Sequence, residues 1–471
     1  MLDGGLIGHS LYGGGKGKDT YKKNVPILAG DNKGHETPRK IYGLLSGKVL
    51  GNTYVTMTGG HVVRNVYGGG NIASVGKGNY AGGTDDYYPA GYGETLHDAA
   101  LWTATTGFKP DEPITASNKP TTMADYFLSS GKTNVRVIGG QVGTKEPKYK
   151  DGLPYGNVLG GSAGEAAPNI SELPRYLYSP AFFSGYVNET DVTIGGYRCK
   201  TANGTYKVGD GITTAEYDAL ASGQDYWEKS GPTILGSVYG GGQDGHVRRD
   251  TKVTVNDGEI GMPYNQTNQG LLETDNLDDP QWLYRGNIFG GGSGVNKYKY
   301  DFNGDGDYED EVTYGGQATK EEDFSNSAGS VTRFTTVDVK GGTIHRNVYG
   351  GGSMGSVGAP KIDQTYDPYK PGQANITDKP VNVPGRQSMN TVIIGGGTGT
   401  VTIGTPDDYQ VHYGGEVYGA SRGLSSESPL GSVVWTKVNI KNGANIKGNV
   451  FGGGDNGKVK MDTDVQIGGT E

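Results

Sequence analysis

Residues 335–358 read TTVDVKGGTIHRNVYGGGSMGSVG, and this stretch contains every part of a unit that recurs along the whole chain. It begins with a short strand pattern in which Val337 and Val339 face one side. A Gly-Gly corner, a second apolar segment and three consecutive glycines follow. Closely similar text recurs as TYVTMTGGHVVRNVYGGG (53–70) and as TKVNIKNGANIKGNVFGGG (436–454). A fixed phrase that returns along a chain predicts a repeat architecture.

Eight copies of the unit can be aligned on the residue between the small aliphatic residue and the glycines. These residues are Tyr12, Tyr67, Leu159, Tyr239, Phe289, Tyr349, Tyr418 and Phe451. The chain also contains eight T-x-V-x-V segments, whose inward pairs are Val55/Met57, Val135/Val137, Val192/Ile194, Val253/Val255, Val337/Val339, Val392/Ile394, Val438/Ile440 and Val465/Ile467. Strict alternation with β-branched residues predicts strands with one buried face.

The spacing of the copies decides between repeat folds. From the first strand valine to the aromatic residue is 12 residues in Val55 to Tyr67, and from the aromatic to the next strand is 14 residues in Tyr239 to Val253. An unadorned unit of 26 residues is too short for a propeller blade, which needs about 40–50 residues. The sequence therefore predicts an all-β fold, a right-handed parallel β-helix of about eight coils. Stacked coils would bury one continuous core of valine and isoleucine.

The residues at the corners have structural explanations. Glycine allows the positive φ or the close backbone approach that a tight corner requires. Asn65, Asn157, Asn287, Asn347 and Asn449 precede the small aliphatic residue and predict an amide ladder in which each side chain bonds the next coil; a row of ligands is the alternative. The aromatic position predicts a packed ladder, with a sugar-stacking stripe as the alternative.

Longer spacings come from insertions at two points of the unit, so we expect residues 1–471 to form a single β-helical segment. The expected insertions are 16–52, 76–132, 143–155, 164–189, 197–234, 262–285, 295–333, 359–389 and 404–413. Loops inserted at equivalent points of a solenoid leave from the same edge, which is often the binding edge. Two walls of loops would then flank a plain face.

One insertion contains a calcium-loop pattern in KYKYDFNGDGDYEDEVTY (297–314). Ca²⁺ binds six to eight oxygen ligands, and alternate acids followed by glycine can wrap around one ion. The candidate ligands are Asp301, Asn303, Asp305, Asp307, Glu309 and Glu311. The first six positions resemble the loop of EF-hand and dockerin-like proteins, but Val312 stands where the bidentate glutamate would be. The prediction is a structural Ca²⁺, with a solvated acidic turn as the alternative. Flanking hairpin strands are expected on both sides.

Composition and motifs narrow the function. The net charge is −9 and the basic residues form no long run, so nucleic acid is not an expected partner. No apolar run is long enough for a transmembrane segment. Catalytic signatures are absent, and the compact polar cluster formed by Asp244, His246, Arg248 and Arg249 is expected to be a charged coil surface, with an enzyme site as the alternative.

The phrases GGHVVRNVYGGG, GGTIHRNVYGGG and GANIKGNVFGGG resemble the Gly-rich, β-helical surface or adhesin-like proteins of gut Bacteroidota. A fainter likeness is to the repeats of autotransporter passenger domains and polymorphic outer-membrane proteins. The likeness covers the repeats and none of the insertions. It implies an exported protein, extracellular or on the bacterial outer cell surface, although residues 1–20 carry no signal-peptide pattern.

Two functions follow as expectations. The first is a non-catalytic surface rod whose loops bind glycan or a host or bacterial surface protein. The second is a polysaccharide-degrading β-helix enzyme, a lyase or glycoside hydrolase. Because neither terminus has the pattern of a polar cap, we also expect further coils of the same polypeptide at both ends.

Overall fold

The protein is seen in a computed structural model that describes most of the repeat units. The described residues are Leu2, 4–17, 20–25, 37–42, 46–76, 131–144, 155–166, 185–200, 206–208, 226–262, 285–299, 313–314, 317–318, 322–325, 328–358, 361–362, 376–377, 389–404, 414–425 and 430–468. Within these residues every regular element is a β-strand. No helix there is long and apolar enough to cross a membrane.

Three parallel sheets of eight strands each form the body of the molecule. Sheet A consists of β5 (Thr53–Met57), β8 (Lys132–Val137), β11 (Glu189–Ile194), β17 (Thr251–Val255), β24 (Thr335–Val339), β29 (Met389–Ile394), β32 (Trp435–Ile440) and β35 (Thr463–Ile467). Sheet B consists of β1 (Leu6–Ile7), β6 (His61–Val62), β9 (Gln141–Val142), β15 (Thr233–Ile234), β18 (Glu259–Ile260), β25 (Gly342–Ile344), β30 (Val401–Ile403) and β33 (Ala444–Ile446). Sheet C consists of β2 (Leu11–Tyr12), β7 (Val66–Tyr67), β10 (Val158–Leu159), β16 (Val238–Tyr239), β19 (Ile288–Phe289), β26 (Val348–Tyr349), β31 (Val417–Tyr418) and β34 (Val450–Phe451).

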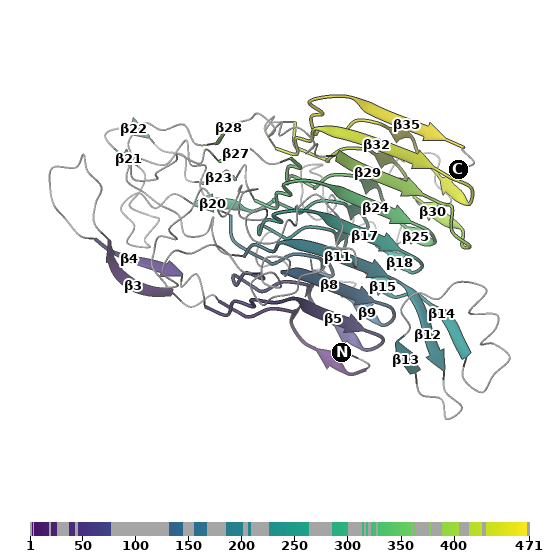
Figure 1. The fold of residues 1–471 in the computed structure, drawn as a ribbon, viewed down its shortest axis with the longest axis horizontal. Helices are drawn as coiled ribbons and strands as arrows, with labels where there is room; N and C mark the ends of the chain where they lie inside the picture. Colours follow the sequence, from purple (N-terminus) through teal and green to yellow (C-terminus); the bar gives the residue numbers. More distant parts are fainter. Residues whose placement is uncertain are drawn as a thin grey trace, which may run out of the picture.

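The order of strands in each sheet follows the order of the chain. The chain passes through sheets A, B and C in turn and returns to sheet A one strand further along. Each repeat therefore supplies one strand to each sheet, and successive repeats stack as coils. Figure 1 shows the N-terminus beside β5 and the C-terminus beside β35, at opposite ends of the stack.

The register of sheet A confirms the predicted alignment of the repeats. Val337 pairs with Val253 on one side and with Val392 on the other. All eight predicted inward pairs occupy the same two columns. In the interior coils these side chains are buried, and they join the inward residues of sheets B and C in one cluster of valine and isoleucine.

A fourth valine column lies outside these sheets and was not predicted. Its members pair as isolated parallel bridges and are Val49, Val75, Val187, Val247, Val331 and Val357, with Val433 paired to Val459. The interior members are buried in a separate apolar cluster. Three of them, Val49, Val187 and Val331, fall inside ranges expected to be insertions. The residues just before each sheet A strand therefore belong to the coil.

The predicted aromatic ladder is present on sheet C. Rings in adjacent coils stack with centroids 4.8–5.0 Å apart, and Leu159 interrupts the series between Tyr67 and Tyr239. Tyr239 and Phe289 are fully buried. The alternative of a sugar-stacking stripe is therefore wrong for the interior of the ladder, because its rings are not accessible.

The asparagine row also binds coil to coil, although its acceptors and donors differ from an amide ladder. The side-chain oxygen of Asn65 accepts the backbone N–H of Asn157 at 3.0 Å, and that of Asn347 accepts the backbone N–H of Glu416 at 3.0 Å. The amide of Asn347 donates to the hydroxyl of Tyr349 in its own coil. The alternative of a ligand row loses support because these oxygens are already hydrogen-bonded.

The first glycine of each triple glycine is required by a close approach. A Cβ at Gly350 would collide with the carbonyl oxygen of Gly419 in the next coil, and it would lie 2.9 Å from Cγ2 of Val392. The Gly-Gly corner has the other requirement, since Gly342 has a φ of 93°. Only glycine adopts such a φ without strain.

Short antiparallel pairs occur within the insertions. In Figure 1, the pair β3 (Thr20–Val25) and β4 (Thr37–Tyr42) and the pair β27 (Lys361–Ile362) and β28 (Ile376–Thr377) lie on one side of the stack. A three-stranded sheet of β12 (Gly196–Lys200), β13 (Tyr206–Val208) and β14 (Tyr226–Ser230) lies on the other side.

The strands beside the acidic loop pair differently from a simple hairpin. β20 (Lys297–Lys299) pairs with β23 (Glu322–Phe324), whereas β21 (Thr313–Tyr314) pairs with β22 (Gln317–Ala318). Both flanking segments are strands, as expected, but they do not pair with each other.

Candidate functional site

The polar segment GGQDGHVRRD (241–250) connects sheet C to sheet A in one coil, between β16 and β17. Val247 in its centre is part of the buried valine column. The polar side chains around it do not form one site. Asp244, Arg248 and Arg249 each contact a different neighbour, as described below.

Arg249 lies almost fully buried against a neighbouring coil. Its Nη1 is 3.9 Å from Oε2 of Glu189 on β11, and its side chain is only 7% exposed. Burial lowers the pKa of Arg249, and the nearby Glu189 carboxylate acts in the opposite direction. A buried guanidinium needs such a partner, because an unpaired buried charge is costly.

Glu189 also binds the preceding coil. Nζ of Lys132 on β8 lies 3.4 Å from Oε1 of Glu189 and 3.3 Å from Oδ2 of Asp191. Burial alone would lower the pKa of Lys132, but the two carboxylates outweigh it and raise the pKa. The amide oxygen of Asn52, one coil further back, accepts the backbone N–H of Lys132 at 2.9 Å.

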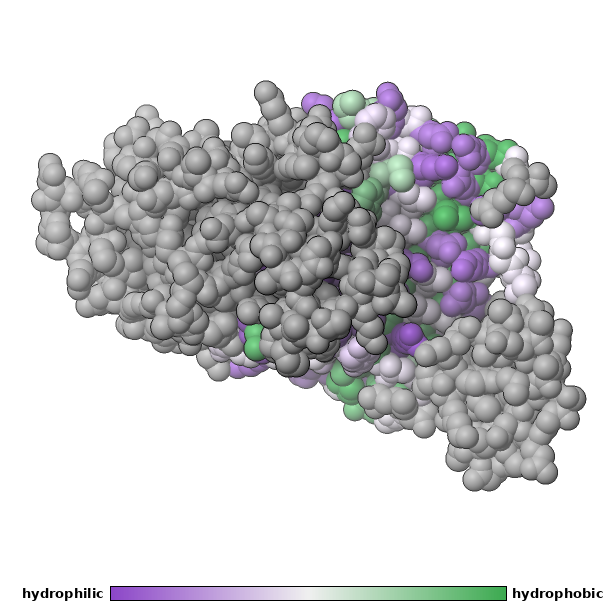
Figure 2. All heavy atoms as spheres, viewed as in Figure 1, coloured by the Kyte–Doolittle hydropathy of each residue, from purple (hydrophilic) through white to green (hydrophobic). Residues whose placement is uncertain are grey.

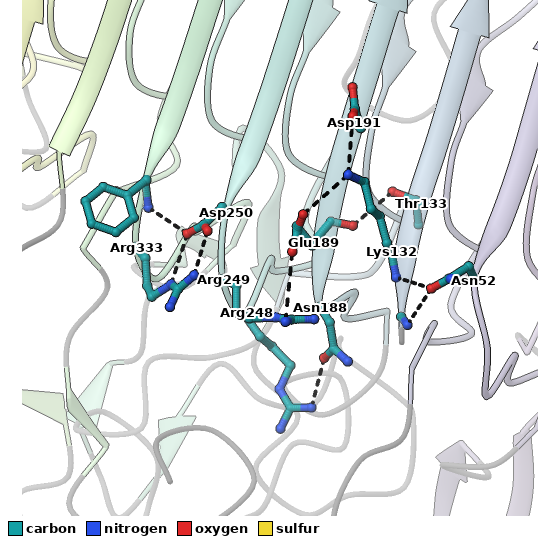
Figure 3. A network of polar contacts seen from close by, with 12 residues as sticks. Asn52, Lys132, Thr133, Asn188, Glu189, Asp191, Arg248, Arg249, Asp250 and Arg333 are labelled. Atoms are coloured by element: carbon teal, nitrogen blue, oxygen red, sulfur yellow. Dashed lines mark hydrogen bonds and ion pairs between the residues drawn. The ribbon is translucent and has the colours of Figure 1, made fainter. Parts of the chain in front are cut away.

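A second ion pair continues this arrangement toward the C-terminus. Nε and Nη2 of Arg333 donate to the two carboxylate oxygens of Asp250 at 3.0 and 2.6 Å. The backbone N–H of Phe334 donates to Asp250 at 3.3 Å. Figure 3 shows these residues at the beginning of successive sheet A strands. We call Lys132, Glu189, Asp191, Arg249, Asp250 and Arg333 the charged network.

Arg248 points to a different set of partners. Its Nη1 donates to Oδ1 of Asn188 at 3.2 Å, and its guanidinium carbon lies 4.8 Å from the centre of the Tyr186 ring. Nζ of Lys48 also contacts that ring, at 5.0 Å from its centre, and donates to the Tyr186 hydroxyl at 2.5 Å. Burial lowers the pKa of Lys48. These contacts again join residues of different coils.

Asp244 is a buried carboxyl group at the base of an insertion. Its Oδ2 accepts a hydrogen bond of 2.6 Å from Nδ2 of Asn296, the residue before β20, and the side chain is 2% exposed. Among the described residues its Oδ1 has no hydrogen-bond partner. Burial, reinforced slightly by the charge of Glu165, raises the pKa of Asp244 to about 7. Asp244 therefore anchors the start of this insertion and titrates near neutral pH.

The histidine in the opening phrase forms a pair with a carboxylate. Nε2 of His345 lies 2.9 Å from Oε1 of Glu259 on the neighbouring strand of sheet B. Burial lowers the pKa of His345, so the ring is neutral at pH 7 and Nε2–H donates to the carboxylate. This pair also connects two successive coils.

The outer face of sheet A is the plain face that the sequence predicted. Outward side chains alternate with the buried ones, and Asp338 pairs with Lys340 on the same strand at 3.2 Å. In Figure 2 the coloured part of this view carries hydrophilic and hydrophobic residues in mixture, without one continuous apolar patch. In the described part of the chain, no group of three or more histidine, cysteine or acidic residues is arranged to hold a metal.

The predicted calcium ligands lie outside the described residues. These are Asp301, Asn303, Asp305, Asp307, Glu309 and Glu311. The charged network, in contrast, is described but was only partly predicted. Sequence analysis identified Arg249 and missed its partner Glu189. A signal was present, since Lys132, Glu189 and Asp250 each immediately precede the threonine of a T-x-V segment.

Comparisons with known proteins add no relative. The sequence matches no family model, no curated protein and no solved structure.

Proposed function

We propose that this chain is a right-handed parallel β-helix that acts as a non-catalytic, adhesin-like rod at the bacterial cell surface. In this proposal the coils form the rigid support, and the loops inserted between them bind a glycan or a surface protein. The three parallel sheets with one strand per repeat support the β-helix.

The observation that carries the proposal is the use of the charged network. Arg249 pairs with Glu189 and Arg333 pairs with Asp250, in each case across two successive coils. A catalytic cluster needs groups that are available to a substrate. Here the compact polar residues stabilise the stack, which leaves the insertions as the candidate contact surfaces.

A glycan array probed with the 471-residue protein tests the proposal. Binding to a defined class of glycan, without release of new reducing ends from that glycan, is the expected result. Release of reducing ends would favour the alternative, a polysaccharide lyase or hydrolase. A shortened variant that replaces 77–130 by a short linker would then locate the contact, because this segment leaves the coil between Gly76 and Gly131.

We also propose a structural Ca²⁺ for the acidic loop, on the sequence pattern alone. The ion would stiffen the loop that follows β20. A calorimetric titration with millimolar Ca²⁺ should release heat with the parent protein and none with the double variant Asp301→Asn and Asp305→Asn. Absence of heat with the parent protein would remove Ca²⁺ from the proposal.

A further inference from the structure

Exposed apolar side chains are confined to the two ends of the stack. Among the described residues the large hydrophobic side chains that are exposed are Leu6, Leu50, Tyr54, Phe451, Met461, Val465 and Ile467. The first three belong to the N-terminal end and the other four to the C-terminal end. Ile467 is 69% exposed, although the residue that pairs with it in the coil below, Ile440, is packed against the core.

The same two ends also carry unpaired strand edges. Sheet A ends at β5 and β35, sheet B at β1 and β33, and sheet C at β2 and β34. A free edge presents unpaired N–H and C=O groups, which can pair with another strand. Each end therefore offers three parallel edges and an apolar centre.

The two ends have complementary steps. At the C-terminal end, β35 extends sheet A one strand beyond the coil that supplies β33 and β34. At the N-terminal end, β1 and β2 extend sheets B and C one strand beyond β5. One end therefore has an extra strand in sheet A, and the other has extra strands in sheets B and C.

We propose that the N-terminal end of one copy of this chain docks on the C-terminal end of a second copy, as one more coil in the same register. β35 would pair with β5, β33 with β1 and β34 with β2. The template for this interface is the contact that the chain itself repeats between its coils. It is a different claim from the proposed glycan or protein binding by the loops.

The register gives each exposed group at one end a partner at the other. Val465 would lie on Val55 of the second copy, in the column that already pairs Val438 with Val465. The ring of Phe451 would stack on Tyr12 of the second copy and extend the aromatic ladder. Asp455 would face Lys16 of the second copy, and both side chains are exposed.

Leu2 occupies the position that Ile467 of the second copy would take. In the free chain Leu2 bridges to Met57, its N–H donates to the carbonyl of Thr56, and its carbonyl accepts the N–H of Thr58. The first three residues must therefore leave before a second copy can dock. This competition weakens the association, and removal of residues 1–3 should strengthen it.

The interface joins two different surfaces, so it does not close on itself in a straight stack. A heterologous contact of this kind produces open filaments. The expected products are end-to-end dimers and longer rods whose population grows with protein concentration.

Cysteine cross-linking tests the register directly, in a Cys199→Ser background. Gln466 and Thr56 are outward-facing residues that would lie side by side on paired strands. Adjacent strands are about 4.8 Å apart, within the range that a disulfide spans. The variant with Gln466→Cys and Thr56→Cys should form disulfide-linked chains under mild oxidation. The control with Asp464→Cys and Thr56→Cys is offset by two residues and should form far fewer.

Sedimentation velocity supplies the second readout. Ile467→Asp should leave the monomer folded, since that side chain is already exposed, and should abolish the larger species. Gln466→Lys on the same strand faces away from the core and should leave them unchanged. Removal of residues 1–3 should shift the population toward larger species. Monomers at every concentration, or equal cross-linking in the matched and offset variants, would overturn the proposal.

Discussion

The hydroxyl of Thr335 donates a buried hydrogen bond of 2.6 Å to the carbonyl oxygen of Gly350. This bond connects the start of a sheet A strand with the residue that follows the sheet C strand of the same coil. Equivalent bonds of 2.5–2.6 Å join Thr53 to Gly68, Thr133 to Gly160, Thr190 to Gly240, Thr251 to Gly290 and Thr436 to Gly452. The threonine of the T-x-V segment is therefore a tie across the coil, and the valines that follow it form the core.

Replacement of this threonine should destabilise the protein. Thr335→Val keeps the shape of the side chain but leaves the Gly350 carbonyl buried without its donor. The expected loss is about 1–3 kcal/mol of unfolding free energy, measured by chemical denaturation. Thr336→Val, on the outward side of the same strand, is the control and should change stability by less than about 0.5 kcal/mol. Equal effects of the two substitutions would contradict the role of the hydroxyl.

One coil lacks the tie, and restoring it should stabilise the protein. Asn390 occupies the threonine position in β29, where its side chain is fully buried and neither amide atom has a hydrogen-bond partner among the described residues. Asn390→Thr would provide a hydroxyl for the carbonyl of Gly419 and remove the unpaired amide. The expected gain is about 1 kcal/mol or more. A loss of stability in the same denaturation experiment would count against this explanation of the threonine row.

The charged network should matter through the buried arginine. Glu189→Gln removes a carboxylate that Arg249 and Lys132 share, and the expected cost is about 1–2 kcal/mol, since Glu189 itself is 31% exposed. The double variant with Arg249→Met should recover most of this loss, because no buried charge then remains. Asp338→Asn, whose partner Lys340 is largely exposed, is the control and should cost about 0–1 kcal/mol. A double variant less stable than Glu189→Gln alone would contradict the assignment.

The buried Asp244 predicts a pH dependence of stability. Its pKa is raised to about 7 in the folded chain from 3.8. Between these values the folded chain binds a proton that the unfolded chain has released. The contribution is therefore complete below about pH 4 and is lost as the pH rises toward 7. Asp244→Asn should stabilise the protein at alkaline pH and have little effect at acid pH. Thermal unfolding across pH, with Asp464→Asn as the exposed control, measures this; a benefit confined to acid pH would refute it.

The strand register could be predicted from sequence because period-two alternation and a fixed repeat leave one arrangement that buries every valine pair. The fourth valine column could not, since Val49 and Val187 stand alone in their segments and no alternation marks them. Arg249 was identified as part of a polar cluster, but its partner Glu189 lies 60 residues earlier in the chain. Pairing across coils depends on the length of each insertion, which local patterns do not determine.

The central claim is that the repeats stack in register as one rod, and a distance between spin labels on its two end strands tests it most directly. Tyr54 on β5 and Asp464 on β35 occupy the same column of sheet A, with six strands between them. Labels there, in the Ile467→Asp background that prevents association, should lie about 34 Å apart, seven strand spacings. A label at Lys252 instead of Tyr54 should shorten this to about 19 Å. Two distances that do not scale with the number of strands between the labels would contradict the stacked fold.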